Sequence, residues 1–388
     1  MIKTSAFSMA IMTRAVLRSV VGSVLCMGCV VAHAQNRYTL QPPQTAVARE
    51  IYSLHSTVLL ICIAICVVVF AVLFYSIVRF RRSRGYEARQ FTGYKPLEVT
   101  WTLVPVLIVI GISIPATRAV FAWKDTSDPD ITVKITGYQW KWRYDYLNED
   151  IGFYSGLTTP QGQIENREPK GEYYLLEVDR PLVVPVGKKV RVLVTANDVI
   201  HSWWVPAFGV KQDAIPGFIR DSWFRVDNPG VYRGQCAELC GKDHGFMPIV
   251  VNAVSASDYL AWVADQHAAK HAAAAGNAAA AGKVYSLEEL KAGGEKVYAR
   301  TCVACHQASG QGMPPAFPAL AHGQIAAGPI AGAIDIVVNG SKKNPAMIAW
   351  KGQLSDVELA SVITYVRNSF GNDLGNTVQP TDIAAVRH

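Results

Sequence analysis

Five residues of metal-binding type gather in two short segments of the chain. One segment is His201-Ser-Trp-Trp-Val-Pro206, and the other runs from Gly234 to Met247. The five residues are His201, Cys236, Cys240, His244 and Met247. Two thiolates, two imidazoles and a thioether are soft and borderline ligands, a set that suits copper. Because the cysteines are four residues apart, both sulfur atoms could bridge a pair of metal ions, and we expect a copper site here.

Two other sites could be built from the same residues. A structural zinc ion takes two cysteine and two histidine ligands, but it would leave Met247 unexplained in a mature chain with only three methionines. A disulfide between Cys236 and Cys240 is the usual state of a cysteine pair in an exported protein. The histidines and the methionine around the pair favour copper over both alternatives.

The motif Cys302-Val-Ala-Cys-His306 forms a second constellation. C-x-x-C-H is the attachment site of a c-type haem. Cys302 and Cys305 would form thioethers with the porphyrin, and His306 would bind the iron. A bare C-x-x-C also occurs in redox disulfides and in half of a zinc site. The adjoining histidine, the expected export and the helical pattern nearby favour haem.

The haem needs a sixth iron ligand, because an electron-transfer haem keeps both axial positions filled. The candidates are Met313, His322 and Met347. Met347 lies 41 residues after His306, in a segment that resembles the distal-methionine loop of small class I cytochromes c. Met313 lies only seven residues after His306, within a Gly/Pro-rich loop. We therefore expect Met347 to be the ligand.

The N-terminus has the pattern of an export signal. Lys3, Arg14 and Arg18 form a basic start, an apolar stretch covers 20–31, and Ala32-His33-Ala34 fits a cleavage site. We expect residues 1–34 to be removed as a signal peptide. A first membrane anchor is the alternative, but the apolar stretch is short for one.

Two long apolar runs follow the signal. Ser56–Val78 has 23 residues and Val99–Thr117 has 19, and neither contains a charged side chain. Each run can cross about 30 Å of hydrocarbon as a helix. We expect transmembrane helices at about 53–79 and 99–123, in a hairpin domain that spans 35–125.

The loop between the two runs is strongly basic, with only two glutamates against its cations. Such an excess marks a cytoplasmic loop, so both outer ends of the hairpin should face the periplasm. The net charge of the chain is a modest +7, and part of it lies in this loop. We therefore expect no nucleic-acid partner. The basic residues are Arg79, Arg81, Arg82, Arg84, Arg89 and Lys95.

Residues 126–263 have the pattern of an all-β domain. Ile131–Ile135 and Lys189–Val194 alternate between apolar and polar side chains, and Tyr173–Val178 is rich in strand-forming residues. Short strands separated by turns predict a β-sandwich or barrel. One distant histidine with a Cys-Cys-His-Met cluster on another loop is also how blue-copper sandwiches build their sites. We expect a cupredoxin-like fold here.

The last part of the chain changes character twice. Residues 264–283 are expected to be a linker, because ten alanines lie between 266 and 283 and no large apolar side chain does. Leu287–Tyr298 and Ser355–Phe370 have helical spacing, so 284–388 should be an all-α cytochrome c domain. The predicted fold class is multidomain: a two-helix transmembrane hairpin, an all-β sandwich and an all-α domain.

The copper constellation resembles that of a known family. C-x-E-x-C-G-x-x-H-x-x-M with an upstream D-V-I-H-S-W is similar to the binuclear CuA motif of cytochrome c oxidase subunit II. The resemblance covers residues 40–263. It implies that both cysteines bridge two copper ions, with the histidines, Met247 and the backbone carbonyl of Glu238 completing the site. It also implies that the Glu238 carboxylate reaches a magnesium ion shared with subunit I.

Two further residues take expected roles from the same resemblance. Gly137–Trp142 is similar to the aromatic stretch against the CuA site, and Trp140 matches a tryptophan through which electrons pass. We expect Trp140 at the electron exit, whereas Trp142 should fill the core, as most tryptophans do. Glu98 aligns with a glutamate at the entrance of a proton pathway. A carboxylate at a helix N-terminus is, however, favoured by the helix dipole alone.

The architecture resembles subunit II of caa-type oxidases. It implies an electron-transfer subunit of a respiratory haem–copper oxidase, passing electrons from haem c through CuA to haem a of subunit I, which reduces oxygen to water. Expected partners are oxidase subunits I and III and a soluble or membrane-bound electron donor. The expected location is the bacterial inner membrane, with the copper and haem domains in the periplasm. The alternatives are the electron-input subunit of a CuA-type nitric oxide reductase and a periplasmic copper-transfer protein.

Overall fold

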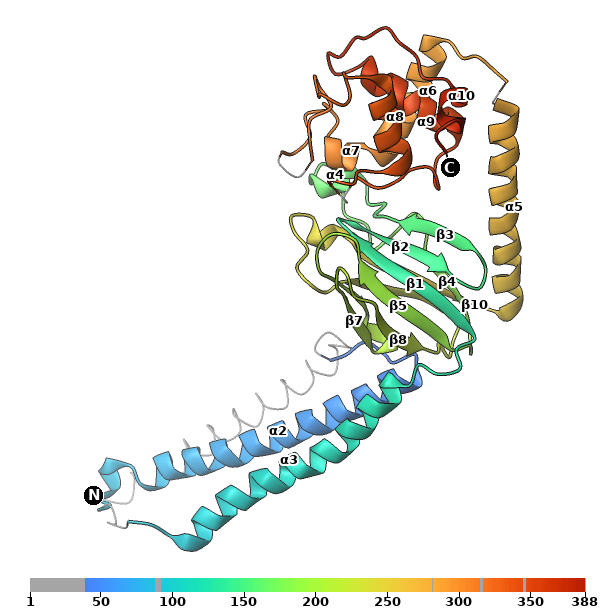
Figure 1. Ribbon diagram of the computed structural model, residues 1–388. Coiled ribbons are helices and arrows are strands. Elements are labelled where there is room, and N and C mark those ends of the chain that lie inside the picture. Colours follow the sequence, from blue (N-terminus) through green and yellow to red (C-terminus); the bar gives the residue numbers. More distant parts are fainter. Residues whose placement is uncertain (1–38, 88–91, 281, 315–316, 345–346, 388) are drawn as a thin grey trace. The chain divides into compact units, whose positions relative to one another are not determined.

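The computed structural model describes residues 39–387 except 88–91, 281, 315–316 and 345–346. The predicted signal peptide and its cleavage after Ala34 lie outside the described residues. Residues Gln44–His388 form one compact unit, separate from the residues that precede it. Along this unit the described elements are a helical pair, two β-sheets, one long helix and a set of shorter helices (Figure 1).

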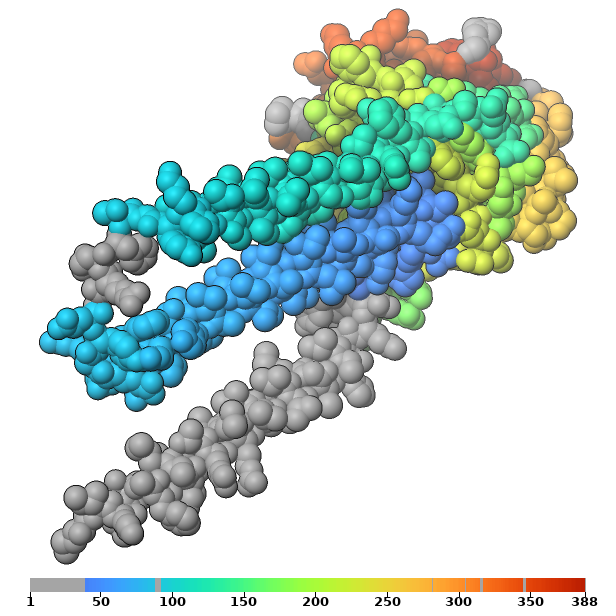
Figure 2. All heavy atoms as spheres, turned by 90° about the horizontal axis from the view of Figure 1, so that it is seen from below, coloured from blue at the N-terminus to red at the C-terminus, as the bar shows by residue number. Residues whose placement is uncertain are grey.

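The first part of the unit is a pair of long helices connected by residues 80–94. They are α2 (Ala46–Arg79) and α3 (Lys95–Lys124), with the 3₁₀ turn η1 (Arg82–Arg84) between them. The two helices lie side by side in both views (Figures 1 and 2). Both have the length and composition of a membrane span, and their apolar windows are not buried by protein. The predicted hairpin is therefore present.

Helix α2 begins seven residues before its predicted start, because its first turn packs on protein. Thr45 caps the helix by accepting a hydrogen bond from Ala48 N at 3.0 Å, and its hydroxyl donates to Phe208 O at 2.8 Å. Val47 and Ala48 are buried. The prediction followed the length of the apolar run, so it could not include this capped first turn, which precedes that run.

The middle part is a sandwich of two five-stranded sheets. Their strand orders are β3-β2-β1-β5-β8 and β4-β10-β9-β6-β7. The inner faces share one core whose largest fully buried side chains include Trp142, Trp203 and Phe208. The strands are β1 (Ile131–Tyr138), β2 (Lys141–Tyr146), β3 (Ile151–Ser155), β4 (Leu182–Pro185), β5 (Val190–Ala196), β6 (His201–Val205), β7 (Val210–Ala214), β8 (Arg220–Phe224), β9 (Gly230–Cys236) and β10 (Pro248–Val254). Short helices interrupt the sandwich at α4 (Gln161–Ile164), η2 (Pro206–Phe208) and η3 (His244–Phe246).

Two of the three strands predicted from the sequence are confirmed, as β1 and β5. The third was wrong: residues 173–178 form turns, and only Val178 makes a β-bridge, with Leu157. Leu175 has φ of 61°, a left-handed conformation that no strand contains. Within this segment the Tyr173 ring contacts Arg233 of β9, whose guanidinium carbon lies 3.6 Å from the ring centroid.

Most of the segment predicted to be a linker, residues 264–280, belongs to the helix α5 (Ala256–Ala280). The expected domain boundary at residue 263 therefore falls inside a helix. Alanine has the highest helix propensity of the common residues, and the first turns of α5 are held by tertiary contacts. The Trp262 ring lies 5.1 Å from Tyr146 and 6.3 Å from Phe153, measured between centroids. Farther along, Lys270 forms an ion pair with Asp150 at 2.7 Å.

The final part is helical, as predicted. Its helices are α6 (Leu287–Thr301), α7 (Val303–His306), α8 (Ile330–Asn339), α9 (Asp356–Arg367) and α10 (Pro380–Ala384). Ser286 and Ser355 each open a capping box, with Glu289 and Glu358 as the reciprocal partners. Helices α6 and α9 cross at Gly294, where a Cβ atom would lie 2.1 Å from Ser361 O. Only glycine permits that close approach.

Candidate metal centre

The predicted copper ligands lie at one end of the sandwich, on three neighbouring chain segments. His201 is the first residue of β6, and Cys236 is the last residue of β9. The loop that follows β9 returns through η3 to β10, so it carries Cys240, His244 and Met247. The hairpin closes where Cys236 N donates to Met247 O at 3.1 Å. Antiparallel pairing of β9 with β10 thus brings the two ends of the ligand loop together.

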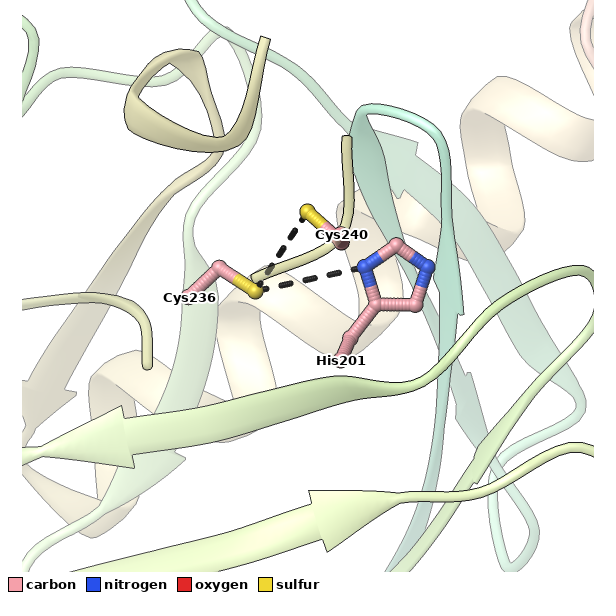
Figure 3. A group of neighbouring side chains, drawn as sticks. All are labelled: His201, Cys236 and Cys240. Carbon is pink, nitrogen blue, oxygen red and sulfur yellow. Dashed lines mark hydrogen bonds between the residues drawn. The ribbon is translucent and has the colours of Figure 1, made fainter. Parts of the chain in front are cut away.

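The donor atoms of these segments converge. The Cys236 Sγ atom lies 3.8 Å from Cys240 Sγ and 3.9 Å from His201 Nδ1. Cys240 Sγ lies 3.4 Å from His244 Nδ1. Figure 3 shows the two sulfur atoms and one ring nitrogen of His201 turned toward one another. The three ligand atoms of His201, Cys236 and Cys240 all lie within 4.8 Å of each other, a spacing that fits soft metal ions.

Two further predicted ligands also border the cluster. Cys236 Sγ lies 3.4 Å from the backbone oxygen of Glu238, while the Glu238 side chain is exposed. Met247 is 1% exposed and belongs to the same core cluster as Cys236 and Cys240. The six described cysteines are all free thiols. The disulfide alternative for Cys236 and Cys240 is thus not what the structure contains.

The pKa values of the two thiols shift in opposite directions. The pKa of Cys236 is lowered because its sulfur shares a hydrogen bond with the Cys240 sulfur and lies beside the His201 ring, and these contacts outweigh the effect of burial. The pKa of Cys240 is raised by that same shared hydrogen bond and by burial. Burial lowers the pKa of His201, but hydrogen bonds to Asp198 and Cys236 outweigh it, so the net shift is upward. One thiolate, the form that binds metal, is therefore favoured in the cluster.

The predicted haem ligands line one hollow of the helical domain. Cys302 ends α6 and His306 ends α7, so the motif is held between two helices. The described lining residues are Lys141, Thr301, Cys302, Cys305, His306, Phe317, Pro318, Asn344, Met347 and Trp350.

His306 is prepared to bind iron through one nitrogen. Its Nδ1 atom donates to Pro318 O at 3.0 Å, which leaves Nε2 as the free lone pair. Burial lowers the pKa of His306 and so favours the neutral ring that binds metals. Pro318 was not identified from the sequence, because nothing marks a carbonyl twelve residues away as the partner of this ring.

The three candidates for the sixth ligand are placed differently. Met347 lines the hollow together with His306. Among the described lining residues neither Met313 nor His322 appears. The Met313 sulfur instead accepts a hydrogen bond from Lys242 Nζ at 3.0 Å, and His322 N donates to Asn372 at 2.7 Å.

Comparison with known proteins places this geometry in a family. The family model described as cytochrome C oxidase subunit II, periplasmic domain, matches residues 131–254, and its transmembrane domain matches residues 32–118. Cytochrome c oxidase subunit 2 of Cereibacter sphaeroides is 42% identical over 236 residues, which cover 58% of this chain and 78% of the relative. The chain belongs to the cytochrome c oxidase subunit II family.

Other similarities of this subunit II follow the same pattern. The relative from Cyanidium caldarium is 40% identical over 228 residues, covering 58% of this chain and 88% of the relative. The solved periplasmic domain of cytochrome oxidase subunit II from Bradyrhizobium japonicum is 42% identical, with a TM-score of 0.33, over 37% of this chain and 96% of that one. A model described as cytochrome C oxidase, cbb3-type, subunit III matches residues 289–366. This subunit II is thus membrane-anchored and carries a fused cytochrome c domain.

The two tryptophans of this subunit II differ in their surroundings. Trp142 is fully buried, and its ring lies edge-on to His201 at 5.9 Å. Trp140 is partly exposed and donates from Nε1 to Cys240 O at 3.2 Å. Its ring centroid lies 5.8 Å from that of Phe317, a lining residue of the haem hollow. Sequence reasoning singled out Trp140 but missed Phe317, which no motif distinguishes.

Lys141 is a second residue that the sequence did not indicate. It belongs to β2, yet it lines the haem hollow, and its Nζ atom lies 4.9 Å from the Trp350 ring centroid.

Glu98, at the start of α3, accepts a hydrogen bond from Tyr94 N at 3.1 Å. The described contact of Glu98 is therefore that of a helix cap.

Proposed function

We propose that this oxidase subunit passes electrons from a covalently bound haem c to a binuclear copper centre, and from there to haem a of subunit I for reduction of oxygen. The observation that carries the proposal is the buried cluster in which the sulfur atoms of Cys236 and Cys240 lie 3.8 Å apart between two histidine rings. A copper pair bridged by both thiolates would share one electron between two metals, so its geometry would change little on reduction.

In this proposal each group of ligands has one role. Cys302 and Cys305 attach the haem, and His306 and Met347 bind its iron. The burial of Met247 and the closeness of the Glu238 carbonyl to Cys236 support both as groups that would complete the copper site. The copper ligands are His201, Cys236, Glu238, Cys240, His244 and Met247.

We assign Trp140 to the step between haem c and copper, not to the exit expected from the sequence. Two contacts support the change. The ring lies against Phe317 of the haem hollow, and its Nε1–H reaches the carbonyl of the copper ligand Cys240. One side chain therefore contacts both sites of the relay.

The remaining assignments concern the assembled oxidase. The exposed carboxylate of Glu238 is free to bind a magnesium ion shared with subunit I. The basic loop between α2 and α3 supports a cytoplasmic location for that loop and a periplasmic one for both cofactor domains. Subunits I and III are the proposed membrane partners, together with a soluble or membrane-bound electron donor. Glu98 is proposed to lie at the entrance of the proton pathway, in addition to capping α3.

Metal analysis of the purified oxidase tests the central proposal. We expect two copper ions and one covalently bound haem c for each chain of this subunit, above those of subunit I, and no stoichiometric zinc. The reason is the set of soft ligands in the cluster. A single copper ion, or one zinc ion per chain, would exclude the binuclear site.

Replacing Met347 with alanine is expected to abolish the low-spin, methionine-ligated spectrum of the haem. Met347 lines the hollow beside His306, whereas Met313 accepts a hydrogen bond from Lys242. Met313→Ala is therefore the matched control and should leave the spectrum unchanged. Visible and near-infrared absorption of the oxidised protein provides the measurement. The opposite result for the two variants would place the axial ligand in the Gly/Pro-rich loop.

A further inference from the structure

Asp198 lies at a junction between the copper ligands and the turn that carries Trp140. Its side chain is only 8% exposed. The Oδ1 atom lies 2.8 Å from His201 Nε2, and Oδ2 accepts a hydrogen bond from Gln139 N at 2.8 Å. One nearly buried carboxylate thus contacts a ligand ring on β6 and the backbone of the β1–β2 turn.

The same turn reaches the second half of the copper cluster. Gln139 Nε2 and Trp140 Nε1 both donate to Cys240 O, at 2.8 and 3.2 Å. Gly241 follows this carbonyl with φ of 117°, and a Cβ there would lie 3.0 Å from Gln139 Nε2 and 3.3 Å from the Trp140 ring. The turn is therefore packed closely against the ligand loop. The contacts form a closed circuit from His201 through Asp198 and the turn to Cys240, and back through the sulfur of Cys236.

We propose that Asp198 is the positioning residue of the copper centre, which fixes the orientation of His201 and holds the Trp140 turn against Cys240. The inference rests on the proposed function, because it assumes that the cluster binds copper. With its Nε2–H donated to the carboxylate, His201 presents the Nδ1 lone pair to the cluster. Figure 3 shows that nitrogen facing Cys236 and the other ring nitrogen turned away. A carboxylate partner of this kind fixes the tautomer and raises the basicity of a ligating histidine.

The substitution Asp198→Asn separates the two parts of this role. Its carboxamide oxygen can still accept the hydrogen bond from Gln139 N, so the turn keeps its anchor. The group that then faces His201 is the amide NH₂, which cannot accept a hydrogen bond, so the charged acceptor for His201 Nε2–H is lost. Asp198→Ala removes both contacts. Asp130→Asn is the matched control, because Asp130 also accepts from a backbone N–H, that of Lys189 at 2.8 Å, and touches no copper ligand among the described residues.

The experiment measures copper binding in the purified oxidase. Chelator competition should show copper affinity lowered about 10–100-fold in Asp198→Asn, the usual cost of losing such a partner. The electron paramagnetic resonance spectrum of the copper pair should change, and its reduction potential should rise, because a negative charge beside the site is lost. The haem c spectrum should stay the same. Asp198→Ala should in addition slow electron transfer from haem c to copper, and Asp130→Asn should alter none of these.

The outcomes that overturn the inference are distinct from those that overturn the function. If the unsubstituted oxidase lacks the copper pair, the proposed function fails. If the pair is present and Asp198→Asn has unchanged affinity, spectrum and potential, only the positioning role fails. If copper is lost completely, thermal unfolding of the copper-depleted oxidase decides. If the copper-depleted variant unfolds at the same temperature as the copper-depleted unsubstituted oxidase, the positioning role is supported. If the variant unfolds at a lower temperature, Asp198 stabilises the fold alone.

Discussion

Replacing Trp140 with phenylalanine should slow electron transfer from haem c to copper while leaving the copper spectrum intact. The indole contacts both the copper ligand loop and Phe317 of the haem hollow. Phenylalanine lacks the Nε1–H that holds the ring on Cys240 O, and its smaller ring leaves a gap. A misplacement of about 1 Å between reacting groups can cost about a hundredfold in rate, so we expect a fall on the order of tenfold to a hundredfold. Flash-induced reduction of the copper pair by haem c gives the rate.

Trp142→Phe is the matched control for this experiment. Trp142 fills the sandwich core and is fully buried, so its truncation should cost about 1–3 kcal/mol of stability, as core substitutions usually do. The electron-transfer rate should change little at a temperature where the variant is folded. If the two variants lose stability to the same degree and neither loses rate, Trp140 is a core residue and has no part in the relay.

Ending the chain after Ala280 should remove most of the turnover that depends on a c-type cytochrome donor. This truncation keeps α5 and the copper domain but deletes the haem domain. A covalently attached partner acts at an effective concentration of about a millimolar. Oxygen uptake should therefore fall by about tenfold or more at micromolar donor. The remaining turnover should depend more strongly on salt, since a free encounter relies on electrostatic steering.

Two comparisons make the truncation informative. A small-molecule reductant that reduces the copper pair directly should support equal oxygen uptake with and without the haem domain. His306→Ala in the full-length chain removes the iron ligand but keeps the protein surface, so it separates loss of the haem from loss of the domain. Unchanged turnover and salt dependence after truncation would mean that electrons bypass the fused haem.

Most of the candidate ligand residues stand out because their chemical types and spacing are local in the sequence. Cys236 to Met247 lie within one β-hairpin connection, and Cys302 to His306 within one helical turn. The supporting residues were not predictable in this way. Asp198 and Gln139 are 59 residues apart, and only the folded sandwich brings them together. Lys141 could not be identified either, because the alternating pattern of its strand does not indicate that this side chain reaches the haem hollow.

The conformations of two other segments were not predictable, for a similar reason. Tyr173–Val178 has the composition of a strand, but Leu175 has a left-handed φ of 61° and the segment turns there. The alanine-rich segment has the composition of a flexible linker. Its helix forms because Tyr259 and Trp262 attach the first turns to the sandwich, and alanine then continues the helix. In both cases tertiary contacts, which composition does not encode, decided the conformation.

The continuity of α5 also restricts how this chain can change in length. The helix is attached near its start by Trp262 and near its end by Asn277, whose side chain accepts a hydrogen bond from Asp356 N at 2.9 Å. Each residue of an α-helix adds about 1.5 Å and turns the chain by about 100°. Inserting a single residue would therefore redirect everything that follows, whereas seven residues, close to two full turns, would nearly restore its direction. Substitutions among the alanines should be tolerated far more readily than small insertions, because the number of residues in α5 determines the direction in which the chain enters the haem domain.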